Sequence, residues 1–379
     1  MDILVVGGGG REHAVIKALN KSRRSGKIYA LPGNGGIAED AECFPVKATD
    51  IEGIVRFARE RKVDFAVVTP DDPLVLGCVD ALEAAGIPCF GPTKDAAVIE
   101  GSKVFSKELM KKYGIPTAKS EAFSEPEAAV AYLKNAPYPA VIKADGLALG
   151  KGVVIAQNFE EAEAAVKNMM VDHVFGASGS RILVEEFLSG PEVSVLSFTD
   201  GNIVVPMLSS MDHKRAKDGD EGLNTGGMGT VAPNPYYTEE IAKECMEQIF
   251  LPTIRAMKAE GRTFKGCLYF GLMLTKDGPK VIEYNCRFGD PETQVVLPLL
   301  TSDLLEIMLA VRGGTLREDM VRFQEGAACC VVLASEGYPQ KYETGFEIAL
   351  PACRANEDIY IAGARKQGEK LVTSGGRVL

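Results

Sequence analysis

Residues 141–153 read VIKADGLALGKGV, which places a glycine-rich loop between two short apolar runs. The apolar runs predict two strands, and Lys143 stands at the end of the first. The loop is not a P-loop, because only three residues separate Gly146 from Gly150, and Gly152 stands where a serine or threonine would bind magnesium. A strand, a glycine loop and a second strand favour a lid over a nucleotide, with Lys143 reaching phosphate oxygens. A plain glycine hairpin is the alternative.

The residues around this loop predict a unit of mixed helices and strands. Its helices are expected at 102–113, 126–134, 160–170, 239–257 and 302–311, and its strands near Ala118 and at 140–143, 153–156, 182–185, 266–274 and 280–284, with a hairpin at 192–209 that turns at Asp200-Gly201. Residues 211–229 are polar and glycine-rich with almost no periodicity, so we expect a functional or mobile loop without regular structure there. A shift at 323–325 opens a last, strand-rich segment.

The first hundred residues alternate short apolar runs with helical patterns. Strands are expected at 3–6, 28–31 and 65–68, helices at 12–19, 54–61 and 73–85, and a short strand and turn at 88–92. This alternation of strands and helices predicts an open, mostly parallel sheet.

Two glycine loops follow the first and second of these strands. Residues 7–10 open a helix, where backbone N–H groups and the helix dipole favour an anion. A dinucleotide fingerprint would need a third glycine at position 12, which is Glu12. The second loop, 32–36, faces the same carboxyl edge of the sheet. The two loops favour a phosphate site without a dinucleotide, and a purely structural turn is the alternative.

Polar residues line one face of the last predicted strand in the central part. Glu283 and Asn285 are two apart, so their side-chain oxygens point the same way. Hard oxygen ligands of this kind suit magnesium that bridges phosphates. Arg287 continues the same face and could hold a carboxylate or an acyl phosphate with both nitrogens. The alternative is a surface strand with a polar face.

Three further segments carry candidate ligand groups. Lys103 follows Ser102, a natural N-cap, and in a first helical turn it either points to solvent or serves a bound anion. Residues 184–188 could present backbone groups to an adenine edge, with Glu192 near ribose hydroxyls. The charged run 212–215 precedes the glycines of 224–229, so substrate contact competes with an ordinary solvated surface.

Composition excludes several classes of protein. Lys and Arg number 42 against 52 Asp and Glu, so the net charge of −10 creates no bulk attraction to nucleic acid or to an anionic membrane. No apolar stretch approaches the roughly 20 residues that span a bilayer. Nine cysteines without metal spacing predict buried free thiols, which fits a cytoplasmic protein.

Together these segments resemble the phosphoribosylamine–glycine ligase family (glycinamide ribonucleotide synthetases) of the ATP-grasp superfamily. The resemblance covers nearly the whole chain. Its blocks are GGGGREHA (7–14), PGNGG (32–36), FGPTK (90–94), EGSK (100–103), VIKADGLALGKGV (141–153), VEEFLSG (184–190), DHKRAKDGDEGLNTGGMG (212–229), VIEYNCRFGDPETQ (281–294) and LVTSGGRVL (371–379).

The resemblance implies three units. These are an N-terminal α/β substrate-binding domain at 1–100, an ATP-grasp domain at 101–324 with a lid at about 118–187, and a small β-rich C-terminal domain at 325–379 that is shorter than in the family. The fold class is therefore a multidomain α/β and α+β chain.

The resemblance also implies the roles of individual residues. For ATP they are Lys103, Lys143, Gly146, Gly150, Lys151, Gly152, Glu185, Glu186, Phe187, Leu188 and Glu192; for the metal, Glu283 and Asn285; for catalysis, Lys143, Arg287, Asp212 and Lys214; and for substrates, Gly8, Gly9, Gly10, Arg11, Asn34, Asp212, Asn224, Arg287, Gly289, Asp290 and Pro291.

The implied activity is ligation of glycine to 5-phosphoribosylamine, with ATP as co-substrate and Mg²⁺ or Mn²⁺ as the metal. The expected state is a monomer that binds small molecules and neither nucleic acid nor membrane. Two alternatives stay open: an ATP-grasp ligase that activates a different carboxylate, and a nucleotide-binding remnant without ligase activity. An oxidoreductase is disfavoured by Glu12 and by the lysine-bearing lid.

Three places depart from the family pattern. Residues 69–72 read TPDD where a Gly-Pro-Glu type turn is expected, and residues 361–364 read IAGA in place of a His-Ala-Gly-Thr type segment. The family would also continue beyond Leu379 with another strand and a helical region. Either the chain was cut short or this member has an incomplete C-terminal unit, which would expose a sheet edge and weaken binding of the ribosyl amine.

Overall fold

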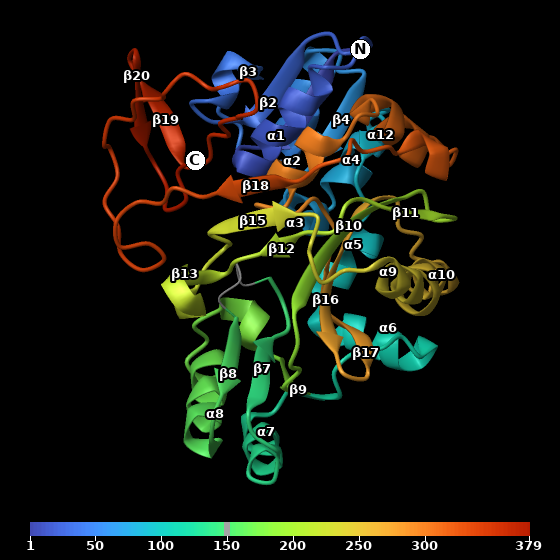
Figure 1. The fold of residues 1–379 in the computed structure, drawn as a ribbon, viewed down its shortest axis with the longest axis vertical. Coiled ribbons are helices and arrows are strands. Elements are labelled where there is room, and N and C mark those ends of the chain that lie inside the picture. The colour runs from blue at the N-terminus through green and yellow to red at the C-terminus, as the bar shows by residue number, and fades with distance from the viewer. Residues whose placement is uncertain (148–151) are drawn as a thin grey trace.

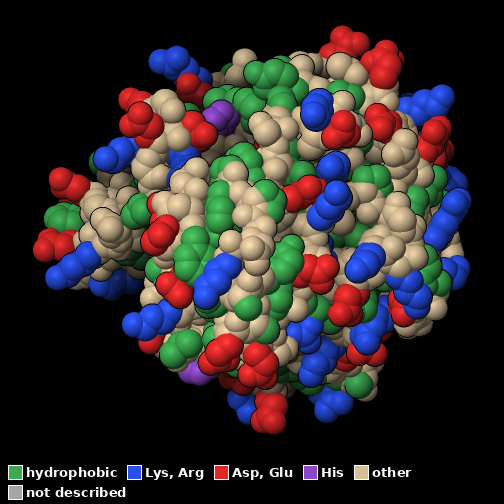
Figure 2. Space-filling view, turned by 90° about the horizontal axis from the view of Figure 1, so that it is seen from below, with side chains coloured by type: hydrophobic (Ala, Val, Ile, Leu, Met, Phe, Trp, Pro, Cys, Tyr) green, Lys and Arg blue, Asp and Glu red, His purple; other side chains and the backbone are tan. Residues whose placement is uncertain are grey.

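The computed structural model describes residues 1–147 and 152–379. Figure 1 shows the N-terminal sheet at the top, the lid at the bottom, and the C-terminal segment beside the N-terminal sheet. Seen from the lid end, acidic and basic side chains are interspersed over the surface (Figure 2). No helix among the described residues is both long and apolar enough to cross a membrane.

The N-terminal sheet has five parallel strands in the order β3-β2-β1-β4-β5. The strands are β1 (Ile3–Gly7), β2 (Ile28–Pro32), β3 (Glu42–Cys43), β4 (Phe65–Val68) and β5 (Cys89–Phe90). Successive side chains of a strand point to opposite faces. Leu4 and Val6 therefore enter one core cluster, and Ile3 and Val5 enter another on the other face. The predicted open parallel sheet is confirmed, with both faces covered.

Helices from distant parts of the chain cover the two faces. The helices are α1 (Gly10–Leu19), α2 (Ile51–Glu60), α3 (Asp71–Leu76), α4 (Cys78–Ala84), α5 (Lys94–Gly101), α11 (Thr293–Leu299) and α12 (Leu304–Gly313). Apolar residues of α1, α11 and α12 share one cluster with Ile3 and Val5. The single helix predicted at 73–85 is wrong. Gly77 adopts a left-handed φ of 91°, which ends α3 and begins α4.

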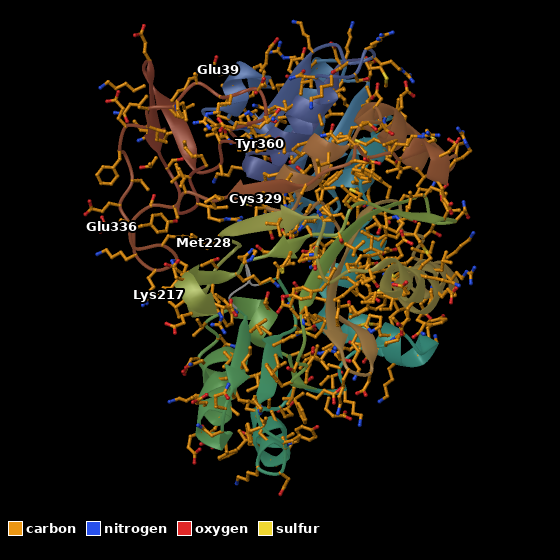
Figure 3. All side chains as sticks on the ribbon, viewed as in Figure 1. Glu39, Lys217, Met228, Cys329, Glu336 and Tyr360 are labelled. Atoms are coloured by element: carbon orange, nitrogen blue, oxygen red, sulfur yellow. The ribbon has the colours of Figure 1, made fainter. Side chains whose placement is uncertain are left out.

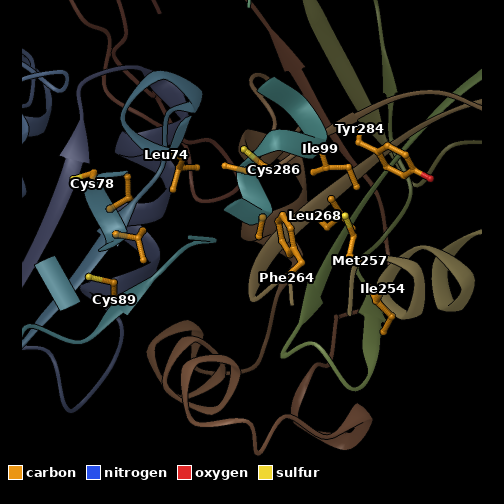
Figure 4. Packing of buried hydrophobic residues seen from close by; sticks show 14 of the residues in the cluster. Leu74, Cys78, Cys89, Ile99, Ile254, Met257, Phe264, Leu268, Tyr284 and Cys286 are labelled. Carbon is orange, nitrogen blue, oxygen red and sulfur yellow. The ribbon is translucent and has the colours of Figure 1, made fainter. Parts of the chain in front are cut away.

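The central sheet runs in the order β11-β10-β16-β17, with every neighbouring pair antiparallel. Its elements and flanking helices are α6 (Lys103–Tyr113), β10 (Glu192–Thr199), β11 (Val204–Pro206), α9 (Glu239–Cys245), a π-helical turn (Met246–Phe250), α10 (Leu251–Ala259), β16 (Gly266–Thr275) and β17 (Gly278–Asn285). The predicted hairpin and both long strands are confirmed. Figure 4 shows one apolar cluster that runs from Leu74 and Cys78 through Ile99 to Leu268 and Tyr284. The N-terminal and central units therefore share a core.

The lid has its own sheet, in the order β6-β9-β7-β8, and its own apolar cluster. Its elements are β6 (Ser120–Phe123), α7 (Pro126–Leu133), β7 (Ala140–Ala144), β8 (Val153–Ala156), α8 (Phe159–Val166), a π-helical turn (Lys167–Val171) and β9 (Ile182–Glu186). The first strand begins at Ser120 rather than near Ala118, and the α-helix predicted to Met170 ends at Val166.

The prediction that 211–229 lacks regular structure is wrong. The stretch holds β12 (Met211–Asp212), β13 (Arg215–Lys217), β14 (Glu221–Asn224) and the start of β15 (Gly229–Ala232). β13 and β14 form a polar hairpin, and β15 pairs with β12 and with β18 (Ala328–Val331). All four residues of β14 are exposed, so the hairpin has no apolar face from which sequence periodicity could reveal it.

The C-terminal segment is the small strand-containing unit that was predicted. After β18 it forms only β19 (Ala364–Gln367) and β20 (Lys370–Thr373) within the described residues. Cys329 and Cys353 are exposed, contrary to the expectation that the thiols are buried, although all nine are free. The segment packs closely on the loop at 32–36, where a Cβ added at Gly36 would lie 2.2 Å from Ile361 Cγ1.

Gly36→Ala should therefore loosen the C-terminal segment from the N-terminal sheet. Overpacking of this kind costs about 1–3 kcal/mol, so the midpoint of thermal unfolding should fall. Gly313→Ala is the control, because a Cβ there has only Thr315 Oγ1 nearby, at 3.6 Å. Equal midpoints for the two variants in calorimetry would contradict the prediction.

Candidate active site

The start of α6 is tied to the glycine-rich loop. Ser102 caps the helix by accepting a hydrogen bond from the Phe105 N–H at 3.1 Å, as its sequence position predicts. Its hydroxyl also donates to Asp145 Oδ1 at 2.9 Å. Lys103 Nζ donates to the carbonyl oxygen of Gly146 at 2.9 Å, so the ammonium lies against the loop rather than in open solvent.

Lys143 lies at the meeting point of three strands. Its side chain on β7 is buried, and its Nζ is 3.2 Å from the carbonyl oxygen of Ile282 on β17. The same Nζ is 3.2 Å from Glu185 Oε2 on β9. The positive charges of Lys103 and Lys143 both lower the pKa of the Glu283 carboxyl group. The structure thus brings together residues that are far apart in sequence.

Lys107 joins this cluster and was not predicted. Its Nζ lies 3.1 Å from the same Glu185 oxygen and 2.7 Å from Thr117 Oγ1. Burial lowers the pKa of Lys107 to about 8, although Glu185 opposes that shift. Lys107 stands four residues after Lys103, which puts both on one face of α6. That spacing is the signal that could have found it.

The carboxylate of Glu283 is kept ionised by its neighbours. Burial alone would raise its pKa, but Lys214, Lys143, Lys103 and Arg287 together hold the pKa below its ordinary value. The Asn285 oxygen accepts a hydrogen bond from Arg287 Nη2 at 3.3 Å, so the side chains of Asn285 and Arg287 lie side by side on one face, as predicted. An ionised carboxylate with an amide oxygen fits a divalent cation that takes its other ligands from phosphates and water.

In the part of the chain that the structure describes, three or more His, Cys, Asp or Glu side chains nowhere gather as metal ligands would.

Arg287 is positioned by a second residue that was not predicted. Its Nη2 lies 3.1 Å from Glu100 Oε1 at the end of α5. The other oxygen of Glu100 accepts the N–H of Cys286 at 2.7 Å. Burial raises the pKa of Glu100, while Arg287 acts in the opposite direction. The signal was available, because Glu100 begins the EGSK block that contains Lys103.

The N-terminal glycine loop is organised by Glu12, the residue that breaks the dinucleotide pattern. Its buried carboxylate accepts the N–H of Gly9 at 2.5 Å and pairs with Arg11 Nε at 2.5 Å. Arg11 also donates to the carbonyl oxygen of Phe288 at 3.2 Å, which brings it beside the Arg287 loop. Glu12 thus orients a guanidinium at the carboxyl edge of the parallel sheet.

Asn34 uses all of its side-chain hydrogen bonds within the protein. Its amide nitrogen donates to Gly8 O at 2.9 Å and to Ile361 O at 2.7 Å, and its oxygen accepts the N–H groups of Gly36 and Ile37. A direct contact between this side chain and a substrate would require one of these bonds to break.

Asp212, on β12, and Lys214 directly precede the polar hairpin. Lys214 Nζ is 3.1 Å from Glu192 Oε2 and also acts on Glu283. Burial, reinforced by Glu292, raises the pKa of Asp212 to about 8. Its Oδ1 is buried without a hydrogen-bond partner among the described residues. A ligand that donates a hydrogen bond would satisfy that oxygen.

The remaining predicted residues lie around this centre. Gly152 accepts the N–H of Ala144 at 2.8 Å, whereas Gly150 and Lys151 lie outside the described residues. Glu186 Oε1 is 3.7 Å from Lys280 Nζ, Phe187 is exposed, Leu188 is half-buried, and Asn224 is exposed at the end of β14. Gly289, Asp290 and Pro291 form the turn after Arg287. Burial would raise the pKa of Asp290, but the positive charges of Arg377 and Arg11 outweigh burial and lower that pKa.

Comparison with known proteins gives a consistent result along the whole chain. Residues 1–100, 101–293 and 328–379 match the N domain, the ATP-grasp (A) domain and the C domain of phosphoribosylglycinamide synthetase. Phosphoribosylamine–glycine ligase from Caldanaerobacter subterraneus subsp. tengcongensis is 49% identical over 378 residues, which cover 100% of this chain and 91% of the relative. The enzyme of the same name from Pasteurella multocida is 48% identical over 100% of this chain and 89% of the relative.

Solved structures agree with these matches. The crystal structure of phosphoribosylamine–glycine ligase from Thermotoga maritima is 34% identical, with a TM-score of 0.86 over 100% of this chain and 91% of that chain. Biotin carboxylase from Campylobacter jejuni, solved as a complex with β-γ-ATP, has a TM-score of 0.77 at 17% identity over 99% of this chain and 87% of that chain, which shows a likeness of fold alone.

The shared oxygen of Glu185 yields a prediction about stability. Glu185→Gln would remove the carboxylate that the buried ammonium groups of Lys107 and Lys143 share, and breaking a buried pair costs about 3–5 kcal/mol. Lys107→Met should cost less, because Lys143 keeps its partner. Urea unfolding followed by circular dichroism measures both, and equal losses of unfolding free energy would contradict the assignment.

Proposed function

The chain belongs to the phosphoribosylglycinamide synthetase family, and on that premise we propose how its residues carry out the family's reaction. It is an ATP-dependent ligase that joins glycine to 5-phosphoribosylamine in purine biosynthesis. The observation that carries the proposal is that Lys143 of the lid reaches the carbonyl oxygen of Ile282, next to Glu283 on β17. Lys103, Lys214 and Arg287 add positive charge that lowers the pKa of the Glu283 carboxyl group.

The reaction asks the protein for position and positive charge rather than for a nucleophile. A carboxylate is a poor electrophile, so an oxygen of glycine first attacks the γ-phosphorus of ATP, and ADP leaves. The amine of 5-phosphoribosylamine then attacks the acyl carbon of glycyl phosphate, and phosphate leaves. Fixed cations around the γ-phosphoryl group stabilise the charge that moves in the first step.

We assign the nucleotide end of the site to the lid and to α6. Lys103 and Lys143 neutralise the phosphates, and Gly146 and Gly152 belong to the cover that keeps water from the acyl phosphate. Residues 185–188 hold the adenine, and Glu192 lies at the ribose. Glu283 and Asn285 would hold Mg²⁺ or Mn²⁺, which when bound neutralises phosphate charge.

We assign the acceptor end to the loops that face the N-terminal sheet. Arg287 binds the carboxylate or acyl phosphate, with Lys214 beside it. Asp212 accepts a hydrogen bond from the amino group of glycine, which would satisfy its buried oxygen. The glycines at 8–10 and Arg11 hold the 5-phosphate, supported by the loop around Asn34 and by the turn at 289–291, and Asn224 lies at the rim.

The domain limits at 1–100, 101–324 and 325–379, a monomeric state and a cytoplasmic location complete the proposal. Nine free cysteines support a reducing compartment.

Phosphate release tests the activity directly. We expect release of phosphate from ATP only when glycine and 5-phosphoribosylamine are both present. Glycyl phosphate cannot form without glycine, and it does not release phosphate until the amine attacks it. Omitting each substrate in turn is the control. Release with neither substrate, or with a different acid in place of glycine, would favour a different ATP-grasp activity.

Two substitutions test the charged centre. Lys143→Ala and Glu283→Gln should each lower turnover by about a hundredfold or more. The first removes positive charge aimed at the reacting phosphates, and the second removes the charged ligand proposed for the metal that would neutralise them. Lys111→Ala on the exposed side of α6 is the control. Circular dichroism and thermal unfolding confirm that each variant is folded, and wild-type turnover in either active-site variant would reject its role.

A further inference from the structure

Arg377, two residues before the end of the described chain, reaches into the acceptor end of the site. Its Nη1 donates to the carbonyl oxygens of Gly226 at 2.6 Å, Gly227 at 3.4 Å and Asp290 at 3.1 Å. Its Nη2 lies 3.3 Å from Asp290 Oδ2. One guanidinium therefore joins the loop after the polar hairpin to the turn after Arg287.

The C-terminal segment holds Arg377 from both sides. The backbone carbonyl oxygen of Arg377 accepts a hydrogen bond from the N–H of Gly363 at 2.9 Å, and the backbone of Arg377 forms an isolated antiparallel β-bridge with Ala334. Tyr338, from the same segment, accepts the N–H of Gly226 at 3.1 Å through its hydroxyl oxygen. Figure 3 shows Met228 and Cys329 at this junction, where Met228 O accepts the N–H of Val332 at 2.9 Å.

The loop that Arg377 holds has little room to move elsewhere. A Cβ added at Gly226 would lie 3.0 Å from the central carbon of the guanidinium. At Gly227, where φ is +107°, a Cβ would lie 2.7 Å from Asp212 Oδ1 and 2.5 Å from Pro291 Cδ. The backbone of these two glycines is therefore packed between the guanidinium, Asp212 and the Asp290-Pro291 turn.

The charges at this junction point to function as well as to packing. The positive charges of Arg377 and Arg11 both lower the pKa of Asp290, and Arg377 also works against the rise in the pKa of Asp212. Asp290 is further fixed by Gln294, whose amide nitrogen donates to Oδ1 at 2.8 Å. The contacts of Arg377 thus end at groups that surround the proposed glycine and ribosyl-amine sites, and none of them reaches Lys103 or Lys143.

We propose that Arg377 is a positioning residue for the acceptor substrates. It clamps the Gly226-Gly227 backbone to Asp290, and so fixes Asp212 and the Arg287 loop in the geometry that glycine and 5-phosphoribosylamine require. This inference rests on the proposed assignment of the acceptor end. It makes the C-terminal segment part of the substrate site, although the segment lies far in sequence from the nucleotide residues.

The test compares Arg377→Met with Arg377→Lys and with Arg365→Met, an exposed arginine of β19 in the same segment. Arg377→Met should raise KM for glycine or for 5-phosphoribosylamine, or lower kcat, by at least about tenfold, as expected for lost hydrogen bonds from a charged group. KM for ATP should change less than about twofold. Arg377→Lys should recover only part of the loss, because an ammonium cannot reproduce the planar fork, and Arg365→Met should match the wild type.

Hydrogen exchange separates this inference from the proposed function. Backbone amides at 225–229 should exchange faster in Arg377→Met than in the wild type, whichever substrates the enzyme takes. Tyr338→Phe serves if Arg377→Met fails to fold, since it removes only the acceptor for Gly226 N–H and should shift the same KM values to a smaller extent. Unchanged kinetics and exchange, or an equal rise in KM for ATP, would overturn the proposal.

Discussion

Positive charge from four parts of the chain surrounds the Glu283 carboxylate and holds its pKa below the ordinary value. Lys103 comes from α6, Lys143 from the lid, Lys214 from the start of the polar hairpin, and Arg287 from the turn after β17. Four cations would repel one another if they were left alone in a buried space. Each therefore has a second partner of its own: a carbonyl oxygen for Lys103, Glu185 for Lys143, Glu192 for Lys214 and Glu100 for Arg287. The lid sheet and the central sheet meet at this cluster, because Lys143 on β7 donates to the carbonyl oxygen of Ile282 on β17. The fold and the charge arrangement therefore depend on each other.

Sequence patterns were most informative where one residue type had one structural use. Apolar runs predicted β1, β2, β4 and the long central strands, and the side chains of Asn285 and Arg287 could be placed on one face from their spacing. Patterns failed where a polar segment folds without a buried face, as in the hairpin β13–β14, and where a single glycine with positive φ divides a helix, as at Gly77. Neither case leaves a periodic apolar signal.

The supporting residues were harder to predict than the charged ones they support. Glu100 contacts the N–H of Cys286 across 186 positions, and Arg377 reaches Gly226 across 151. No local rule connects such residues, because the partner is chosen by the packing of whole units. Asn34 illustrates the converse: the family resemblance implied a substrate contact, and the structure shows its amide hydrogen-bonded to backbone groups on both sides of the junction with the C-terminal segment.

The shared apolar cluster on the α1 face of the parallel sheet has a consequence for how the chain is made. The residues of α11 and α12 that cover Ile3 and Val5 follow them about 290 positions later in the chain and are therefore synthesised later. At the usual pace of roughly 5–20 residues per second, a ribosome needs about 15–60 seconds to supply that cover. During this interval one apolar face of the parallel sheet stays exposed to water. We therefore expect its strands to bind a chaperone during synthesis.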